Sequence, residues 1–225
     1  LLRHGSYFAL RHGQSVANME GIISSDPAIG TVRHGLTANG RAQARAAATR
    51  LLDLCGRDDV DGLIFVTSDF TRAVETAEEC RAALARIVDF ERAAVDDAAS
   101  FPAPPLAVRA ELRERFFGEL DATVLVNYNK VWPKDLEDAA QGGYGVESVS
   151  SVAARLRKLI LSLEEGHQNA SLVLTSHADT LQILQCYVAE ADVRLFSQYR
   201  FANGEIRQLF QDPFSLPAPK PLSYK

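Results

Sequence analysis

The residues best suited to chemistry in this sequence are two arginines, two histidines and an asparagine that follow short apolar segments: Arg11, His12, Asn18, Arg72 and His177. A neutral imidazole is a good nucleophile at phosphorus, because its unperturbed pKa of about 6.5 leaves it largely unprotonated at neutral pH. Guanidinium groups offer paired N–H donors to the oxygens of a phosphoryl group. Together these residue types indicate a phosphate site in which one histidine is the nucleophile.

Three nearly continuous apolar runs could bring these residues together: residues 7–10, 63–67 and 172–175. Such runs are typical of parallel strands that helices cover on both faces. Helical periodicity lies between them, at residues 44–55, 71–85 and 149–163 and again near Thr180, with Ser148 as a candidate N-cap. The alternation predicts an α/β fold, a three-layer α/β/α sandwich with a mostly parallel central sheet. Open sheets bind ligands at the carboxyl ends of their strands, which is where the two arginines, the two histidines and the asparagine occur.

The length of 225 residues favours one domain over residues 1–225. Two segments interrupt the alternation of strands and helices. Residues 96–106 contain three prolines and are predicted to form a loop insertion. Residues 212–225 contain four prolines and are predicted to form an extended proline-rich tail.

The composition argues against several classes of protein. The net charge of −5 disfavours binding to nucleic acid or to an anionic membrane, since both need a cationic surface. The three cysteines are far apart and odd in number, which indicates reduced thiols. The sequence contains no run of about 18 apolar residues and no signal-peptide pattern. We therefore expect a cytoplasmic protein whose partner is a small phosphorylated substrate.

Several short motifs follow one another along the chain. They are LRHGQS at 10–15 with Asn18, LTANG at 36–40, SDFTRA at 68–73, ELRER at 111–115 with Gly118, GVES at 145–148, TSH at 175–177, and Asn203 before Glu205. In this order they resemble the histidine phosphatase superfamily, also called the phosphoglycerate mutase-like proteins, over residues 7–210. The resemblance implies a phosphoglycerate mutase-like fold, with no metal and no organic cofactor.

For these residues, the resemblance implies the same roles that the chemistry of their side chains indicates. His12 attacks phosphorus and becomes a phosphohistidine, and His177 acts beside it. The phosphate-binding set is Arg11, Asn18, Arg72 and His177. For Arg72 an alternative is a structural ion pair with Glu75 or Glu78 on its own helix.

The leaving alkoxide needs a proton, and Glu114 is the candidate acid, which would then activate the attacking water. Glu111 and Glu119 lie close enough to serve instead, but the spacing of Glu114 to Gly118 in the resembled motif favours Glu114. Ser24 is either a substrate contact or an ordinary loop hydroxyl.

The remaining histidines have simpler interpretations. Arg-His-Gly also occurs at residues 3–5 and 33–35. Too few residues precede His4 for a strand to hold it, and His34 is expected at the surface or the rim of the site. His167 ends a predicted helix, where a cation complements the helix dipole.

These observations predict a metal-independent phosphatase, of the histidine acid phosphatase type, that hydrolyses a phosphate monoester. A phosphoglycerate mutase-type isomerase is an alternative, but mutases of the family carry paired arginines after the acid, and residues 116–144 contain only Lys130 and Lys134 as cations. A catalytically weak, phosphate-binding signalling module is another alternative. Its support is Ala178, where the family usually has glycine, followed by Asp179, an acid near the anion site.

Overall fold

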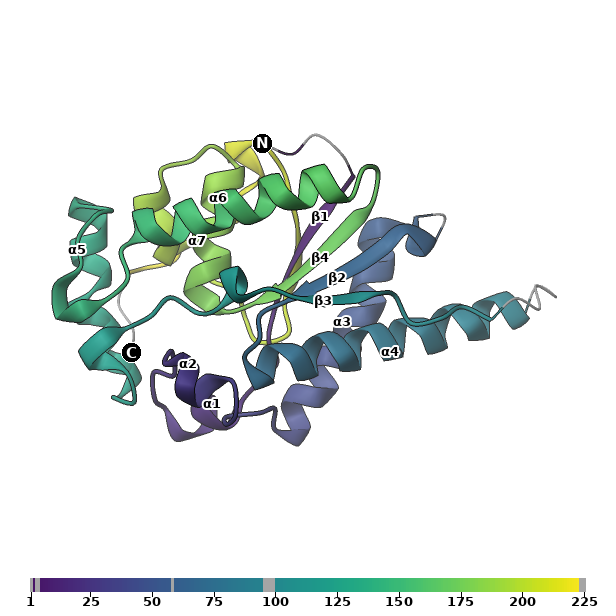
Figure 1. Ribbon diagram of the computed structural model, residues 1–225, viewed down its shortest axis with the longest axis horizontal. Helices are drawn as coiled ribbons and strands as arrows, with labels where there is room; N and C mark the ends of the chain where they lie inside the picture. The colour runs from purple at the N-terminus through teal and green to yellow at the C-terminus, as the bar shows by residue number, and fades with distance from the viewer. Residues whose placement is uncertain (1, 3–4, 58, 95–99, 223–225) are drawn as a thin grey trace.

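The computed structural model describes residues 2, 5–57, 59–94 and 100–222. These residues form a five-stranded sheet with the strand order β3-β2-β4-β1-β5 (Figure 1). The first four of these strands run parallel, and β5 is antiparallel to β1 at one edge. The strands are β1 (Tyr7–Arg11), β2 (Leu63–Thr67), β3 (Leu106–Val108), β4 (Ser171–Ser176) and β5 (Ile206–Leu209). The mostly parallel sheet is confirmed, and its strands come from segments between residues 7 and 209.

Helices cover both faces of the sheet and complete the three predicted layers. Tyr7 and Ala9 of β1 face the core beneath α6 and α7, whereas Phe8 and Leu10 face the core beneath α3 and α4. Successive strand residues point to opposite faces, so a continuously apolar strand fills both cores. The helices are α1 (Val16–Glu20), α2 (Pro27–Gly30), α3 (Ala38–Cys55), α4 (Thr71–Ala93), α5 (Trp132–Glu137), α6 (Val149–Gly166) and α7 (Ala178–Val188).

Local signals fix several helix ends. Ser148 accepts a hydrogen bond from the backbone N–H of Ser151 and caps α6, as predicted. The long α4 continues to Ala93, beyond the predicted end at residue 85. Its last turns are held by the segment that follows, since Asp89 accepts a hydrogen bond from the backbone of Phe101 and Arg92 lies over the Phe101 ring.

The two interrupting segments differ in detail from the prediction. Residues 96–99 of the predicted loop lie outside the described residues, and residues 100–105 have no regular structure. The inclusion of Leu106 in this loop is wrong, because Leu106 begins β3 and pairs with β2.

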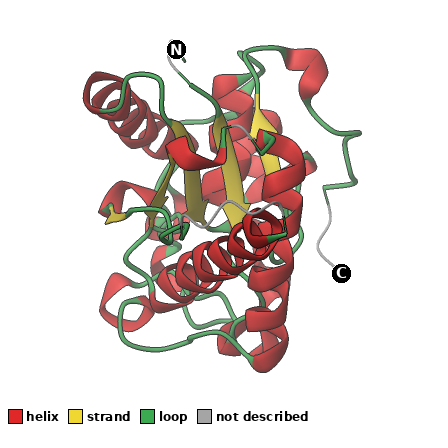
Figure 2. Cartoon of the chain, turned by 90° about the vertical axis from the view of Figure 1, so that its right-hand side faces the viewer, coloured by secondary structure: helices red, strands yellow, loops and turns green. Residues whose placement is uncertain are grey.

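The tail is extended except for one short turn, η7 (Pro213–Ser215), which Asp212 caps. Residues 223–225 lie outside the described part of the chain. Figure 2 shows the tail passing along the outside of the molecule after the edge strand β5. Among the described residues, no helix combines the length and the apolarity needed to cross a membrane.

Candidate active site

The site lies where three adjacent parallel strands end. The backbone N–H of His12, after β1, donates to the carbonyl of Ser176 at the end of β4 at 3.0 Å, and the N–H of Ser68, after β2, donates to Thr175 at 3.0 Å. These bonds continue the strand pairing beyond the sheet and place His12, Ser68 and His177 side by side. The two imidazole rings are 5.2 Å apart between centroids.

The imidazole of His12 is held in one tautomer. Its Nδ1 lies 2.7 Å from the carbonyl of Gly13, an acceptor, so Nδ1 carries the proton and Nε2 presents its lone pair. Burial, together with the charges of Arg72 and Arg11, holds the pKa of His12 well below 6.5. His12 is therefore a neutral imidazole with its nucleophilic nitrogen already defined.

Glycine at position 13 is required by close packing of the backbone. A Cβ on Gly13 would lie 2.3 Å from the carbonyl oxygen of Gly40, and a Cβ on Gly40 would lie 2.1 Å from that of Gln14. Both positions therefore exclude side chains. The first turn of α3 therefore packs directly on the loop that carries His12, which explains the glycines in the motifs at residues 10–15 and 36–40.

Arg72, in the first turn of α4, is buried against His12. Its Nε donates to Nε2 of His12 at 3.2 Å, and its Nη2 donates to the carbonyl of Ser24 at 2.8 Å. The alternative pairing with Glu75 does not occur, because the Glu75 carboxylate binds Arg41 at 2.6 Å instead. Burial lowers the pKa of Arg72 to about 10, so it remains a cation at neutral pH.

Ser24 lines the cavity that also contains His12, and its hydroxyl contacts Arg72 and His34. Its hydroxyl lies 3.3 Å from Nη1 of Arg72 and 2.9 Å from Nδ1 of His34. His34 also approaches Glu20 at 3.8 Å and lies at the rim, the location expected for it. His4, in the Arg-His-Gly at residues 3–5, lies outside the described residues.

Arg11 and Asn18 complete the wall beside His12. Nη1 of Arg11 donates to the carbonyl of Phe201 at 2.6 Å. Oδ1 of Asn18 accepts from the backbone of Ser15 at 3.0 Å and from Nδ2 of Asn203 at 3.1 Å, within the capping box of α1. With its oxygen fixed in this way, the amide of Asn18 directs its N–H donors away from the cap, and the residue lines the cavity.

His177 lies behind His12 and does not itself line the cavity. Its Nε2 is 2.9 Å from the hydroxyl of Ser68, which already accepts a hydrogen bond from Phe70. The Ser68 hydroxyl can donate to Nε2 or accept from it, so this contact does not fix the tautomer of His177. The Nδ1 of His177 is buried without a hydrogen-bond partner among the described residues. Burial and the Arg72 charge hold the pKa of His177 well below 6.5.

Of the three candidate acids, Glu114 is the one that lines the cavity. One of its carboxylate oxygens accepts hydrogen bonds from the backbone of Arg115 at 3.0 Å and from the backbone and hydroxyl of Thr180, each at 3.3 Å. Glu119 is exposed, and Glu111 and Glu119 are both absent from the lining. The spacing argument for Glu114 therefore agrees with the geometry.

Asp179 is more deeply involved than the sequence suggested. Its carboxylate accepts from the indole N–H of Trp132 and the amide of Gln182, each at 3.2 Å, and lies 3.6 Å from the guanidinium of Arg115. Burial and the nearby charge of Glu114 raise the pKa of Asp179 to about 7. These contacts direct the Asp179 carboxylate towards α5, where Trp132, Gln182 and Arg115 supply its hydrogen bonds and its ion pair.

The cavity has a volume of about 560 Å³, within the range of small-molecule sites. One end is lined by Arg11, His12 and Arg72, and the outer part by an aromatic wall in which Tyr128 stacks on Trp132 at 4.8 Å between ring centroids. Sequence reasoning missed the following members of the outer part: Leu125, Tyr128, Phe201, Arg200, Lys220 and Pro221. They come from short turns and from the tail, which carry no periodic signal. A second cavity of about 620 Å³, between α3 and β5, contains none of the predicted catalytic residues.

Within the described residues, no cluster of three or more histidine, cysteine or acidic side chains could hold a metal ion. The three cysteines are unpaired. Burial raises the pKa of the Cys80 and Cys186 thiols to about 12, which makes both poor nucleophiles.

Solved structures share this fold at low sequence identity. A mycobacterial glucosyl-3-phosphoglycerate phosphatase complexed with VO3 is 23% identical, with a TM-score of 0.67 over 91% of this chain and 90% of that one. A putative alpha-ribazole-5'-P phosphatase from Escherichia coli is 20% identical, with a TM-score of 0.62 over 99% of both chains. A phosphoserine phosphatase mutant from Entamoeba histolytica, in complex with phosphoserine, is 18% identical, with a TM-score of 0.64 over 91% of this chain and 89% of that one.

Comparison with curated protein sequences found no match. The model of the histidine phosphatase superfamily (branch 1), however, matches residues 7–213, which include every motif residue discussed above. The chain belongs to the histidine phosphatase superfamily.

Proposed function

We propose that the protein is a phosphatase that hydrolyses a phosphate monoester through a phosphohistidine on His12. The observation that carries this proposal is the state of the His12 ring: Nδ1 is committed to the Gly13 carbonyl, and Nε2 faces Arg72 inside the cavity at 3.2 Å. Nε2 attacks phosphorus, the bond from phosphorus to the ester oxygen breaks, and Arg72 turns its Nε donor from the imidazole to the phosphoryl group.

The donors around His12 suit a phosphoryl group. Arg11 and Arg72 supply guanidinium N–H groups, and Asn18 supplies amide N–H groups from the wall that it shares with Arg11. The buried Nδ1 of His177 has no hydrogen-bond partner among the described residues, and a proton on this nitrogen would be an unsatisfied buried donor that costs about 1–3 kcal/mol. A phosphoryl oxygen beside His12 would satisfy it.

Glu114 supplies the proton that the leaving alkoxide takes up. Its carboxyl lines the cavity, and three N–H and O–H groups hold one of its oxygens, so the other oxygen can carry the transferred proton. In the second half of the reaction, the Glu114 carboxylate removes a proton from the attacking water. The bond from phosphorus to Nε2 then breaks, and His12 returns to its neutral form.

Two observations favour hydrolysis over isomerisation. Phosphatases are among the proteins of similar fold, including those named for glucosyl-3-phosphoglycerate, alpha-ribazole-5'-P and phosphoserine. Lys130 and Lys134, the only cations of residues 116–144, do not line the cavity, and Lys134 lies over the Tyr144 ring at 4.9 Å. The segment therefore does not supply the basic groups that would retain and turn a mutase intermediate.

The test is turnover and trapping in the presence of EDTA. Wild type should release phosphate from p-nitrophenyl phosphate, and acid quenching should trap an acid-labile phosphate that is absent from His12→Ala and retained in the control His167→Ala. Isomerisation of 3-phosphoglycerate without release of phosphate would replace the phosphatase proposal with the mutase. If wild type shows neither labelling nor turnover on a broad panel of esters, the proposal fails in favour of a phosphate-binding module.

A further inference from the structure

The C-terminal tail is fixed against the mouth of the cavity by backbone contacts. The N–H of Lys220 donates to the carbonyl of Gln198 at 2.8 Å. Arg200 donates through Nη2 to the carbonyls of Pro221 at 2.6 Å and Leu222 at 3.0 Å. Proline fixes φ, so this proline-rich segment loses less conformational entropy on docking than an ordinary chain would. The tail therefore forms a wall of the site.

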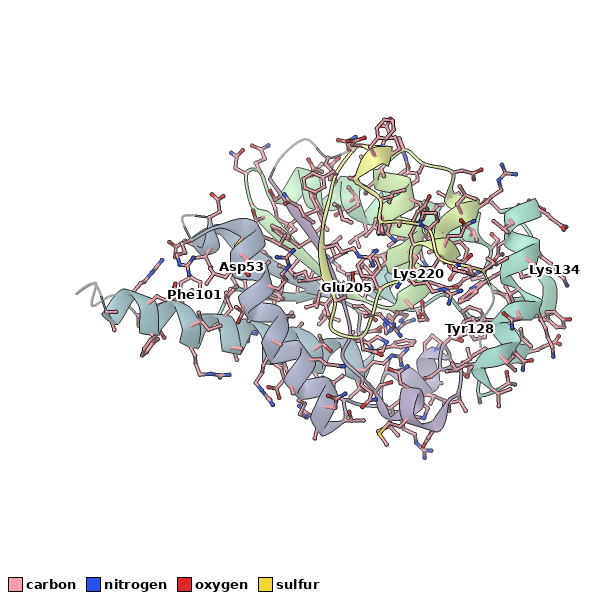
Figure 3. All side chains as sticks on the ribbon, turned by 180° about the vertical axis from the view of Figure 1, so that it is seen from behind. Asp53, Phe101, Tyr128, Lys134, Glu205 and Lys220 are labelled. Carbon is pink, nitrogen blue, oxygen red and sulfur yellow. The ribbon has the colours of Figure 1, made fainter. Side chains whose placement is uncertain are left out.

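The contact continues from the tail to the floor of the cavity. The guanidinium of Arg200 lies over the Trp132 ring at 5.0 Å, and the indole N–H of Trp132 donates to Asp179. Lys220 and Tyr128, both labelled in Figure 3, line the same cavity, one from the tail and the other from η4 (Leu125–Lys130). The tail is thus joined to the aromatic wall on the leaving-group side.

Lys220 differs from the other cations of the cavity. Its ammonium group forms no hydrogen bond and no ion pair within the described part of the chain, whereas Arg200 is held by tail carbonyls. The two carboxylates that line the cavity have other partners: Glu114 binds Thr180 and its neighbour, and Asp179 binds Trp132 and Arg115. None of the described carboxylates therefore neutralises the positive charge of Lys220 at the mouth of the cavity.

We propose that Lys220 is a specificity-determining residue, and that the preferred substrate is a phosphate ester whose leaving group carries a second anionic group. The phosphoryl group lies against His12, the body of the leaving group lies along Tyr128 and Trp132, and the second anion meets Lys220. This inference rests on the proposed phosphatase function. It predicts a preference that p-nitrophenyl phosphate, which has no second anion, cannot reveal.

The experiment compares esters that differ only in the second charge. A short pair is 3-phosphoglycerate and glycerol 3-phosphate, and a long pair is 6-phosphogluconate and glucose 6-phosphate. The preference is the ratio of kcat/KM for the anionic to the neutral member of each pair. It should exceed one for wild type in at least one pair and fall about two- to fivefold in Lys220→Gln, as expected for an exposed ion pair. Lys220→Arg should retain it, and so should Lys130→Gln, whose side chain lies outside the cavity.

Binding to the same ligands separates this inference from the phosphatase proposal. Trp132 is the single tryptophan of the chain and lies in the cavity wall, so its fluorescence reports binding without turnover. If the protein proves inactive, a preference for the anionic ligands that Lys220→Gln abolishes supports the subsite alone. The inference is overturned if Lys220→Gln leaves both pairs unchanged, in turnover and in binding, or if wild type prefers the neutral members.

Discussion

Acidification tests the charge state of His12 and His177. Both are buried and have pKa values well below 6.5, whereas in the unfolded chain they take up protons near that pH. Between the folded and unfolded pKa values the unfolded state binds more protons, so the free energy of unfolding falls as the pH falls. Each histidine contributes about 1.4 kcal/mol per pH unit in this range, and the pair about 2.7 kcal/mol.

Asp179 acts in the opposite direction. Its pKa is raised to about 7, so the folded state binds more protons than the unfolded state between about 4 and 7, and acidification stabilises it there. The pH slope of wild type is therefore smaller than the sum for the two histidines. A comparison of variants removes this contribution, because Asp179 is present in all of them.

The perturbation is His12→Gln and, separately, His177→Gln, with urea unfolding measured between about pH 7.5 and 4.5. Below about pH 6.5, each variant should lose stability more slowly than wild type, by about 1.4 kcal/mol per pH unit. The control Val32→Gln, an exposed position without a titratable group, should keep the wild-type slope. Parallel curves for wild type and both site variants would refute the argument, since the histidines would then titrate in the folded protein as they do in the unfolded chain.

Three further predictions concern the site and its support. Arg72→Lys should lower kcat/KM for phosphate esters about 100-fold or more, because an ammonium cannot reproduce the guanidinium donors beside His12; activity within a few-fold of wild type would contradict this. Glu114→Gln should reduce kcat about 100-fold or more for alkyl phosphates but much less for p-nitrophenyl phosphate, whose leaving group needs little protonation; an equal loss for both would exclude Glu114 as the acid. Arg115→Ala should lower the free energy of unfolding by about 3–5 kcal/mol in urea titrations, because it leaves the buried Asp135 without its partner; a loss below about 1 kcal/mol would show that the pair is not important for stability.

The position of the site could be predicted because two strong signals coincide. The apolar runs located β1, β2 and β4, and these are adjacent in the sheet, so the residues that follow them must converge. The identity of those residues then indicated the chemistry. The choice of Glu114 over Glu111 and Glu119 rested on the spacing to Gly118 in the resembled motif, because the acid segment lies in short turns where periodicity does not fix which side chain faces inward.

The outer part of the cavity could not be predicted, for physical reasons. Its wall depends on the stacking of Tyr128 on Trp132 and on contacts from Arg200 to backbone carbonyls of the tail. Backbone acceptors are the same in every residue, so the sequence carries no pattern for them. The tail has the composition of an irregular segment, and only its docked position shows that Lys220 belongs to the site.

Two buried arginines illustrate how an acidic chain can keep a positively charged site. Arg115 is buried and forms a bidentate ion pair with Asp135 at 2.7 and 2.8 Å; although burial lowers its pKa, Asp135 raises it above its usual value. Arg72 is equally buried, but its donors meet only neutral groups, the imidazole of His12 and the carbonyl and hydroxyl of Ser24, and its pKa is lowered. Because none of the described carboxylates lies within hydrogen-bonding distance of Arg72, the field of Arg72 acts on whatever enters the cavity. The cost of burying an uncompensated cation is then recovered when an anion binds, which is the arrangement expected of a binding group and not of a structural one.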